Sequence, residues 1–149
     1  MQKNKRFRKG FTLIELLLVL VILAVLGAVV VPKFTKRSQQ AKETAAKTDI
    51  ANLEVAIDSF EIDTGRYPTN TEGIRVLIDE PSNTKDDWKG PYLKRGVPLD
   101  PWGNEYYYKQ PGQYNEYGYD LHSAGPDGIS GNEDDITNWT EDKYNTKNN

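Results

Sequence analysis

The chain has 149 residues, enough for one small domain and an anchoring segment, and a formal net charge of −3. It contains no cysteine, which excludes disulfides, thiol catalysis and cysteine-ligated zinc or iron–sulfur sites. The first ten residues carry five basic and no acidic side chains, so residues 11–149 hold 14 basic and 22 acidic ones. Because so acidic a remainder offers no electrostatic footprint for phosphates, we expect no nucleic-acid partner.

The N-terminal part of the chain is strongly apolar. Between Phe11 and Val31 the only polar side chains are Thr12 and Glu15. A helix over residues 11–31 would be roughly 30 Å long, the thickness of a bilayer's hydrocarbon core. The segment exceeds the ~7–15-residue apolar core of a secretory signal peptide, and no small-residue cleavage site follows it. We therefore predict a single membrane-spanning helix, with the basic leader placing the N-terminus in the cytoplasm.

Glu15 is the unusual residue of this segment, because a carboxylate near hydrocarbon costs at least ~2.5 kcal/mol and needs a partner. A plain signal anchor leaves it unexplained. The run from Gly10 through Phe11 to Glu15, after the basic leader at residues 1–10, resembles the processing site of type IV pilin-like proteins. The resemblance implies that a membrane aspartic peptidase, the prepilin peptidase, cuts between Gly10 and Phe11 and N-methylates Phe11.

Cleavage there would create an α-amino group at Phe11. On a helix, Phe11 and Glu15 are four residues apart and lie on one face. An ammonium and a carboxylate attract strongly in a medium of low dielectric constant. If the amine belongs to a neighbouring copy, the pair sets the register of a filament, so Glu15 is predicted to be an assembly residue.

The helical pattern continues beyond the apolar segment. Pro32 is expected to kink or loosen the helix. An apolar stripe then resumes at steps of three, four or seven residues. Its members are Phe34, Ala41, Ala45 or Ala46, Ile50, Leu53, Ile57 and Phe60. We expect one long helix from about Phe11 to Asp63, ended by Gly65, whose second half packs on a globular head.

The rest of the chain predicts a small head with an α+β fold. Residues 72–79 indicate a short helix, and residues 81–103 have the composition of ordered loops pinned by Trp88, Tyr92 and Trp102. Two strands, at residues 105–109 and 114–121, are expected on either side of a turn at Pro111-Gly112. The long N-terminal helix and this short antiparallel sheet define the fold class, with the head spanning residues 32–139 and a flexible tail at 140–149.

An acidic loop follows the second predicted strand. Residues 123–135 hold four acidic side chains among three glycines. Hard oxygen ligands on flexible turns, without histidine or cysteine, favour Ca²⁺ over zinc or copper, and Mg²⁺ fits less well. The EF-hand spacing is missing. From composition alone, a calcium site and a solvated acidic turn remain equally open.

A second resemblance bears on this loop. The motifs Pro98-Leu99-Asp100-Pro101-Trp102-Gly103, Ser123-x-Gly-x-Asp-Gly and Asp-Asp-Ile-x-Asn-Trp (134–139) resemble the major pseudopilin family of type II secretion. The resemblance, which covers residues 10–139, implies calcium binding in the loop. The matching side-chain ligands are Asp127, Asp134 and Asp135, and the implied backbone ligands are the carbonyls of Ala124 and Ile129.

The family resemblance implies a structural subunit, not an enzyme. His122, the only histidine, has no evident nucleophile partner. Copies would polymerise into a periplasmic pseudopilus that drives protein export, from an inner-membrane precursor with a periplasmic head. The implied partners are other copies, the prepilin peptidase, minor pseudopilins and the inner-membrane secretion platform. The alternatives are a type IV pilus subunit and a membrane-anchored calcium-binding module that does not polymerise.

Overall fold

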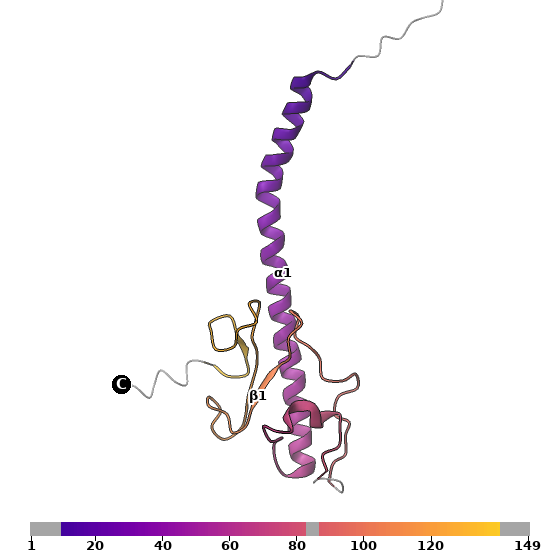
Figure 1. Cartoon of the computed structure of the whole chain (residues 1–149), viewed down its shortest axis with the longest axis vertical. Coiled ribbons are helices and arrows are strands. Elements are labelled where there is room, and N and C mark those ends of the chain that lie inside the picture. The colour runs from indigo at the N-terminus through magenta and orange to yellow at the C-terminus, as the bar shows by residue number, and fades with distance from the viewer. Residues whose placement is uncertain (1–9, 83–86, 141–149) are drawn as a thin grey trace, which may run out of the picture. The chain divides into compact units, whose positions relative to one another are not determined.

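The computed structural model describes residues 10–82 and 87–140 (Figure 1). Residues 1–9 of the predicted leader (1–10) and residues 141–149 of the predicted tail (140–149) lie outside the described residues. The side chains of residues 29–35 in the helix, Pro32 and Phe34 included, also lie outside them. The chain divides into two compact units, residues 1–38 and 39–149. Helix α1, Leu13–Thr64, begins in the first unit and ends in the second. Its assigned bounds lie close to the predicted 11–63.

The second unit is built on the C-terminal part of α1. The predicted stripe supplies its core: Ala46, Ile50, Leu53, Ile57 and Phe60 are all buried. Burying such side chains contributes roughly 1.5–3 kcal/mol each for the larger ones. Gly65 ends the helix as expected, with a φ of +72° and its N–H donating to the carbonyl of Glu61 at 2.8 Å.

A 3₁₀ helix, η1, spans Gly73–Leu77 and is shorter than the predicted helix at 72–79. Three aromatic side chains connect the loops to α1 and to η1. Trp88 donates its indole N–H to the carbonyl of Val76 at 2.9 Å. The hydroxyl of Tyr92 donates to Asp63 at 2.8 Å, and the indole N–H of Trp102 donates to Gln39 at 3.2 Å. The predicted role of all three aromatics is therefore confirmed.

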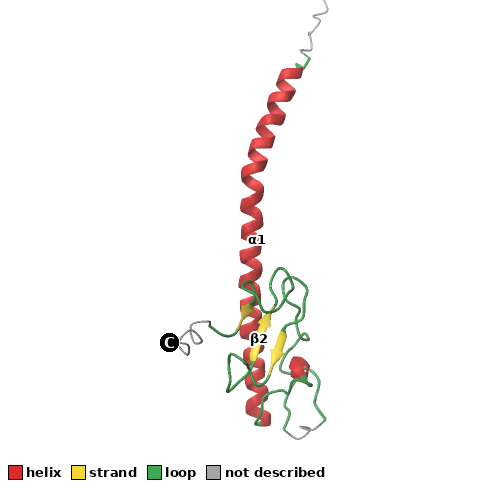
Figure 2. Ribbon diagram, turned by 60° about the vertical axis from the view of Figure 1, so that its left-hand side comes forward, coloured by secondary structure: helices red, strands yellow, loops and turns green. Residues whose placement is uncertain are grey.

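A small antiparallel sheet lies against this part of α1 (Figure 2). Its strands are β1, Tyr107–Lys109; β2, Asp120–Ser123; and β3, Ile136–Thr137, in the order β1-β2-β3. Tyr108 pairs with Leu121 in the β1–β2 register. Leu121 of this pair is fully buried, and together with the buried Ile136 of β3 it joins the hydrophobic core.

The second predicted strand, 114–121, is wrong in its first six residues. The carboxylate of Asp120 is buried and accepts hydrogen bonds from the backbone N–H groups of Gln113, Tyr114 and Asn115. These bonds curl the segment into a loop, because they occupy backbone donors that a strand would use in its ladder. Tyr117, in the middle of this segment, is 99% exposed. The short strand β3 was not predicted at all.

Candidate functional sites: the N-terminal helix and the acidic loop

The start of α1 is closed by a reciprocal hydrogen-bond pair between Thr12 and Glu15. The backbone N–H and the hydroxyl of Thr12 both donate to Glu15 Oε2 at 2.9 Å. The N–H of Glu15 lies 3.3 Å from Thr12 Oγ1, which accepts from it. Because α1 begins at Leu13, Thr12 is the N-cap and Glu15 the third helical residue, the geometry of a capping box.

This local role of Glu15 was missed by the sequence reasoning, although the signal Thr-x-x-Glu was present. The cap gives the carboxylate neutral hydrogen-bond donors but no opposite charge. Phe11, which precedes the cap, is 83% exposed. The pairing of Glu15 with the amine of Phe11 in a neighbouring copy stays a prediction.

The large apolar side chains that the structure describes in the first unit are exposed. From Leu13 to Leu26 the large hydrophobic residues are between 48% and 82% exposed. A continuous apolar surface of this length marks a site of contact with protein or lipid. Among the described residues, however, no helix meets the combined length and apolarity required of a membrane span.

In the acidic loop, Asp127 holds its own turn together. Its Oδ1 accepts from the N–H of Ile129 at 2.8 Å, and its Oδ2 accepts from the side-chain amide of Asn132 at 2.9 Å. Ile129 itself is 64% exposed. Asp127 therefore orders this part of the loop through one backbone donor and one side-chain donor.

Asp135 sits at the inner end of the loop, with a side chain only 7% exposed. Its Oδ2 accepts from the N–H of Gly131 at 2.8 Å, but its Oδ1 is buried without a hydrogen-bond partner. His122 Nε2 lies 3.9 Å from Oδ2 and 2.6 Å from the hydroxyl of Ser130. Burial lowers the pKa of His122 although the nearby Asp135 carboxylate opposes that shift. The imidazole is therefore a weak source of positive charge for Asp135.

Asp134 lies close to Gly125, the residue that follows Ala124. Gly125 has a φ of +65°, and a Cβ placed on it would lie 2.2 Å from the Asp134 carbonyl oxygen and 3.2 Å from Asp134 Oδ2. Only glycine permits both the conformation and this close approach. Ala124, whose carbonyl is an implied ligand, is completely buried beside Gly125.

These residues fit calcium in chemistry, although their carboxylates do not converge. Within residues 10–82 and 87–140, no three His, Cys, Asp or Glu side chains come together as they would around a metal ion. The candidate donors are all hard oxygens, which Ca²⁺ prefers. The unpartnered buried Oδ1 of Asp135 is the atom that a cation would satisfy, since an orphaned buried carboxylate oxygen is otherwise costly.

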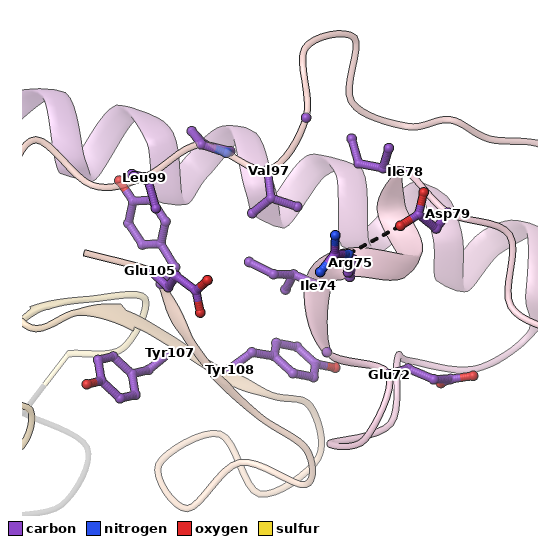
Figure 3. Close-up of a pocket in the computed structure, with 14 residues that line it drawn as sticks. Glu72, Ile74, Arg75, Ile78, Asp79, Val97, Leu99, Glu105, Tyr107 and Tyr108 are labelled. Atoms are coloured by element: carbon purple, nitrogen blue, oxygen red, sulfur yellow. Dashed lines mark hydrogen bonds and ion pairs between the residues drawn. The ribbon is translucent and has the colours of Figure 1, made fainter. Parts of the chain in front are cut away.

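A separate cavity of about 630 Å³ opens between η1, β1 and the loop around Val97 and Leu99 (Figure 3). Ile74 and Tyr108 face it from η1 and β1. The charged groups of Arg75 and Asp79 pair with each other at 3.3 Å. The part of its lining that the structure describes contains no histidine, serine or threonine.

A long capped N-terminal helix, with an apolar first part and a second part supporting a small α+β head, defines the class of pilin-like proteins. Comparisons with known proteins narrow this class. The family described as "Type II secretion system (T2SS), protein G" matches residues 33–139, and the prokaryotic N-terminal methylation motif matches residues 5–31.

The chain is similar to type II secretion system core protein G of Escherichia coli K12, with 43% identity over 135 residues, 89% of this chain and 91% of the relative. It is also similar to the Pseudomonas aeruginosa protein of that name, with 43% identity over 142 residues, 91% of this chain and 98% of the relative. The crystal structure of the major pseudopilin from the type 2 secretion system of enterohaemorrhagic E. coli matches with a TM-score of 0.62 and 35% identity, covering 70% of this chain and 87% of that chain.

The chain belongs to the type II secretion system protein G family. The expectation of a secretion pseudopilin, in preference to a type IV pilus subunit, is thereby confirmed.

Proposed function

We propose that this chain is the major structural subunit of a type II secretion pseudopilus and that it polymerises through its N-terminal helix. The observation that carries the proposal is the start of α1. An apolar surface more than three helical turns long is left uncovered, and the carboxylate at its end receives neutral hydrogen-bond donors from Thr12. Copies of the same helix would bury that surface, and the amine of a neighbouring copy would supply the charge.

Before assembly, the helix would hold the chain in the inner membrane, with its N-terminus in the cytoplasm and its head in the periplasm. The prepilin peptidase would cut between Gly10 and Phe11 and methylate Phe11, in keeping with the matched methylation motif. Minor pseudopilins and the inner-membrane secretion platform would be its other partners. In this proposal the chain supplies structure to the export machine and catalyses no reaction.

The capping box makes a sharp test of the Glu15 pairing possible. Glu15→Gln keeps an oxygen that can accept from the Thr12 N–H, because glutamine also serves in capping boxes, but it removes the charge. We expect Glu15→Gln to be processed normally and to yield few sheared filaments, as Glu15→Ala should. Glu15→Asp should be intermediate, because its chain is one methylene shorter. Wild-type filament yield from Glu15→Gln would assign Glu15 to capping alone.

We further propose that the acidic loop binds one Ca²⁺ ion through the side chains of Asp127, Asp134 and Asp135 and the carbonyls of Ala124 and Ile129. The unpartnered Oδ1 of Asp135 and the all-oxygen donor set support this assignment. The ion would neutralise carboxylates that repel one another and would tie the two ends of the loop together. Asp127 would have to exchange hydrogen bonds to Ile129 and Asn132 for the ion, so the outer end of the loop would change most.

Thermal unfolding of the detergent-solubilised chain tests the calcium proposal. Binding to the native state adds RT ln(1 + [L]/Kd), about 2.7 kcal/mol at a hundredfold excess of calcium over Kd. We expect a higher Tm in calcium than in chelator, little rescue by Mg²⁺, and no calcium response in Asp127→Ala. Equal Tm values for the wild type in calcium and in chelator, with no heat of binding by calorimetry, would contradict the calcium proposal. The loop would then be a solvated acidic turn.

A further inference from the structure

A second buried carboxylate lies just outside the acidic loop, in the turn after Pro98. Asp100 is 4% exposed. Its Oδ1 accepts from the backbone N–H groups of Trp102 at 3.0 Å and Asn104 at 2.8 Å. Its Oδ2 accepts from the hydroxyl of Ser123, which is completely buried, at 2.5 Å. Asp100 thus joins its own turn to the end of β2, where the acidic loop begins.

Ser123 forms hydrogen bonds both to Asp100 and to the acidic loop. Because its hydroxyl hydrogen is donated to Asp100, its oxygen is left to accept, and it accepts from the N–H of Gly125 at 3.1 Å. The order of donors is therefore fixed: Gly125 donates to Ser123, and Ser123 donates to Asp100. A carboxylate enforces that order, since it can only accept.

The N–H of Gly125 and the carbonyl of Ala124 belong to one rigid peptide unit. That peptide is trans, because the cis peptides of the described chain are at Gly90-Pro91 and Gln110-Pro111. In a trans peptide the N–H and C=O point in opposite directions. Holding the N–H against Ser123 therefore aims the Ala124 carbonyl away from Ser123.

The turn that Asp100 organises also touches the loop elsewhere. A Cβ placed on Gly128 would lie 3.5 Å from the side-chain amide of Asn104. Gly125, in turn, packs closely against the backbone and carboxylate of Asp134. A displacement of Gly125 would consequently move both Ala124 and Asp134, two of the proposed ligands.

We propose that Asp100 is a positioning residue for the acidic loop, acting through Ser123 to hold the Ala124–Gly125 peptide in the orientation that calcium binding requires. The inference rests on the proposed calcium site and adds to it two residues that touch no metal. Groups that orient metal ligands in this way are typically worth 10–100-fold in metal affinity.

Asp100→Asn is the informative variant, because it changes almost no volume. Its Oδ1 can still accept from Trp102 and Asn104, but its amide nitrogen would donate to Ser123, which leaves the hydroxyl hydrogen without its acceptor. Calorimetric titration of the detergent-solubilised full chain with calcium should show a Kd raised about 10–100-fold. Hydrogen exchange in chelator should show faster exchange at the Gly125 amide.

Asp120→Asn is a matched control. Asp120 is also 4% exposed and also accepts from successive backbone N–H groups, at Gln113, Tyr114 and Asn115. It organises the loop before β2 and not the acidic loop. Its variant should lower the Tm in chelator as Asp100→Asn does, yet leave the calcium Kd unchanged.

Ser123→Ala provides a second route to the same answer and carries the test if Asp100→Asn does not fold. It deletes the hydroxyl that links Asp100 to Gly125, so it should also raise the calcium Kd. In the double variant the two effects should not add, because Asp100 acts through Ser123. Additive effects would contradict that route.

The outcomes separate the two proposals. A wild-type chain that binds no calcium would overturn the calcium proposal and this inference with it. A wild-type chain that binds calcium, together with an unchanged Kd in Asp100→Asn and Ser123→Ala, would overturn only the positioning role. An equal loss of affinity in Asp120→Asn would show that general destabilisation is the cause.

Discussion

Two threonine–glutamate pairs show how the same local geometry serves different purposes. Thr69 and Glu72 repeat the hydrogen bonds of Thr12 and Glu15: the N–H and hydroxyl of the threonine both donate to the carboxylate at 2.9 Å. Glu72 also receives two bonds of 2.8 Å from the Arg66 guanidinium. The head thus supplies a counter-charge within the chain at Glu72, whereas Glu15 is given only neutral donors by Thr12.

The Arg66–Glu72 pair predicts an acid-sensitive contribution to stability. The hydrogen bonds from Arg66 lower the pKa of Glu72 from 4.5 to about 2. A carboxylate with a lowered folded-state pKa stabilises the fold above its unfolded pKa, and this stabilisation is lost as the pH falls from about 4.5 towards 2. Glu72→Gln should cost about 1.5–3 kcal/mol of unfolding free energy at neutral pH.

Chemical denaturation of wild type and Glu72→Gln across this pH range checks the prediction. The difference in unfolding free energy should shrink as the pH falls from about 4.5 towards 2, because the Glu72 carboxylate of the unfolded wild-type chain takes up its proton before that of the folded chain does. Arg75 and Asp79 form a far more exposed pair, so Asp79→Asn should have little effect at any pH. A pH-independent difference for Glu72→Gln would contradict the assignment.

At the scale of the elements, the C-terminal part of α1 carries the core of the head. Phe60 is fully buried, meets Tyr92 edge-on at 6.0 Å, and lies 5.5 Å below the Arg66 guanidinium. Phe60→Ala should cost about 3–5 kcal/mol, because it removes a large side chain from a packed site. Ile62, two residues on, is 78% exposed, so Ile62→Ala should stay within about 0.5 kcal/mol. The denaturant midpoints of the two variants check this. A large decrease for Phe60→Ala alone indicates that the stripe packs the core, whereas similar midpoints for both variants would indicate that only helix propensity matters.

The elements that could be predicted from the sequence are those with a local, repeating signal. The apolar stripe from Ala46 to Phe60 and the terminator at Gly65 are one helical pattern over many turns, and both were correct. The strand boundary at Asp120 could not be predicted. Its carboxylate reaches back to backbone groups five to seven residues earlier, a contact that no alternation of apolar residues encodes.

The candidate sites could be predicted where their residues are close together in the sequence, and not where only the fold brings them together. Gly10, Phe11 and Glu15 form a contiguous motif, and Asp127, Asp134 and Asp135 share one loop. Asp100 and Ser123 are 23 residues apart, and only the fold brings them together. The Thr12–Glu15 cap is also local, because Thr-x-x-Glu at the start of a helix is a capping-box pattern.

For the whole molecule, the division at residue 38 separates two kinds of surface. The second unit has a buried apolar core, whereas the large apolar side chains described in the first unit, from Phe11 to Leu26, are exposed. The exposed apolar surface of the first unit needs to be covered by other molecules. In our proposal, lipid covers it before assembly and other copies of the chain cover it afterwards. We therefore propose that removal of the leader converts a membrane-held precursor into a filament subunit.

Intact-mass spectrometry of the chain recovered from sheared filaments tests that claim most directly. We predict a mass that begins at Phe11 and carries one added methyl group, with Gly10→Leu leaving the precursor uncut and absent from filaments. Filaments composed of chains that still begin at Met1, from cells with an active prepilin peptidase, would contradict the account.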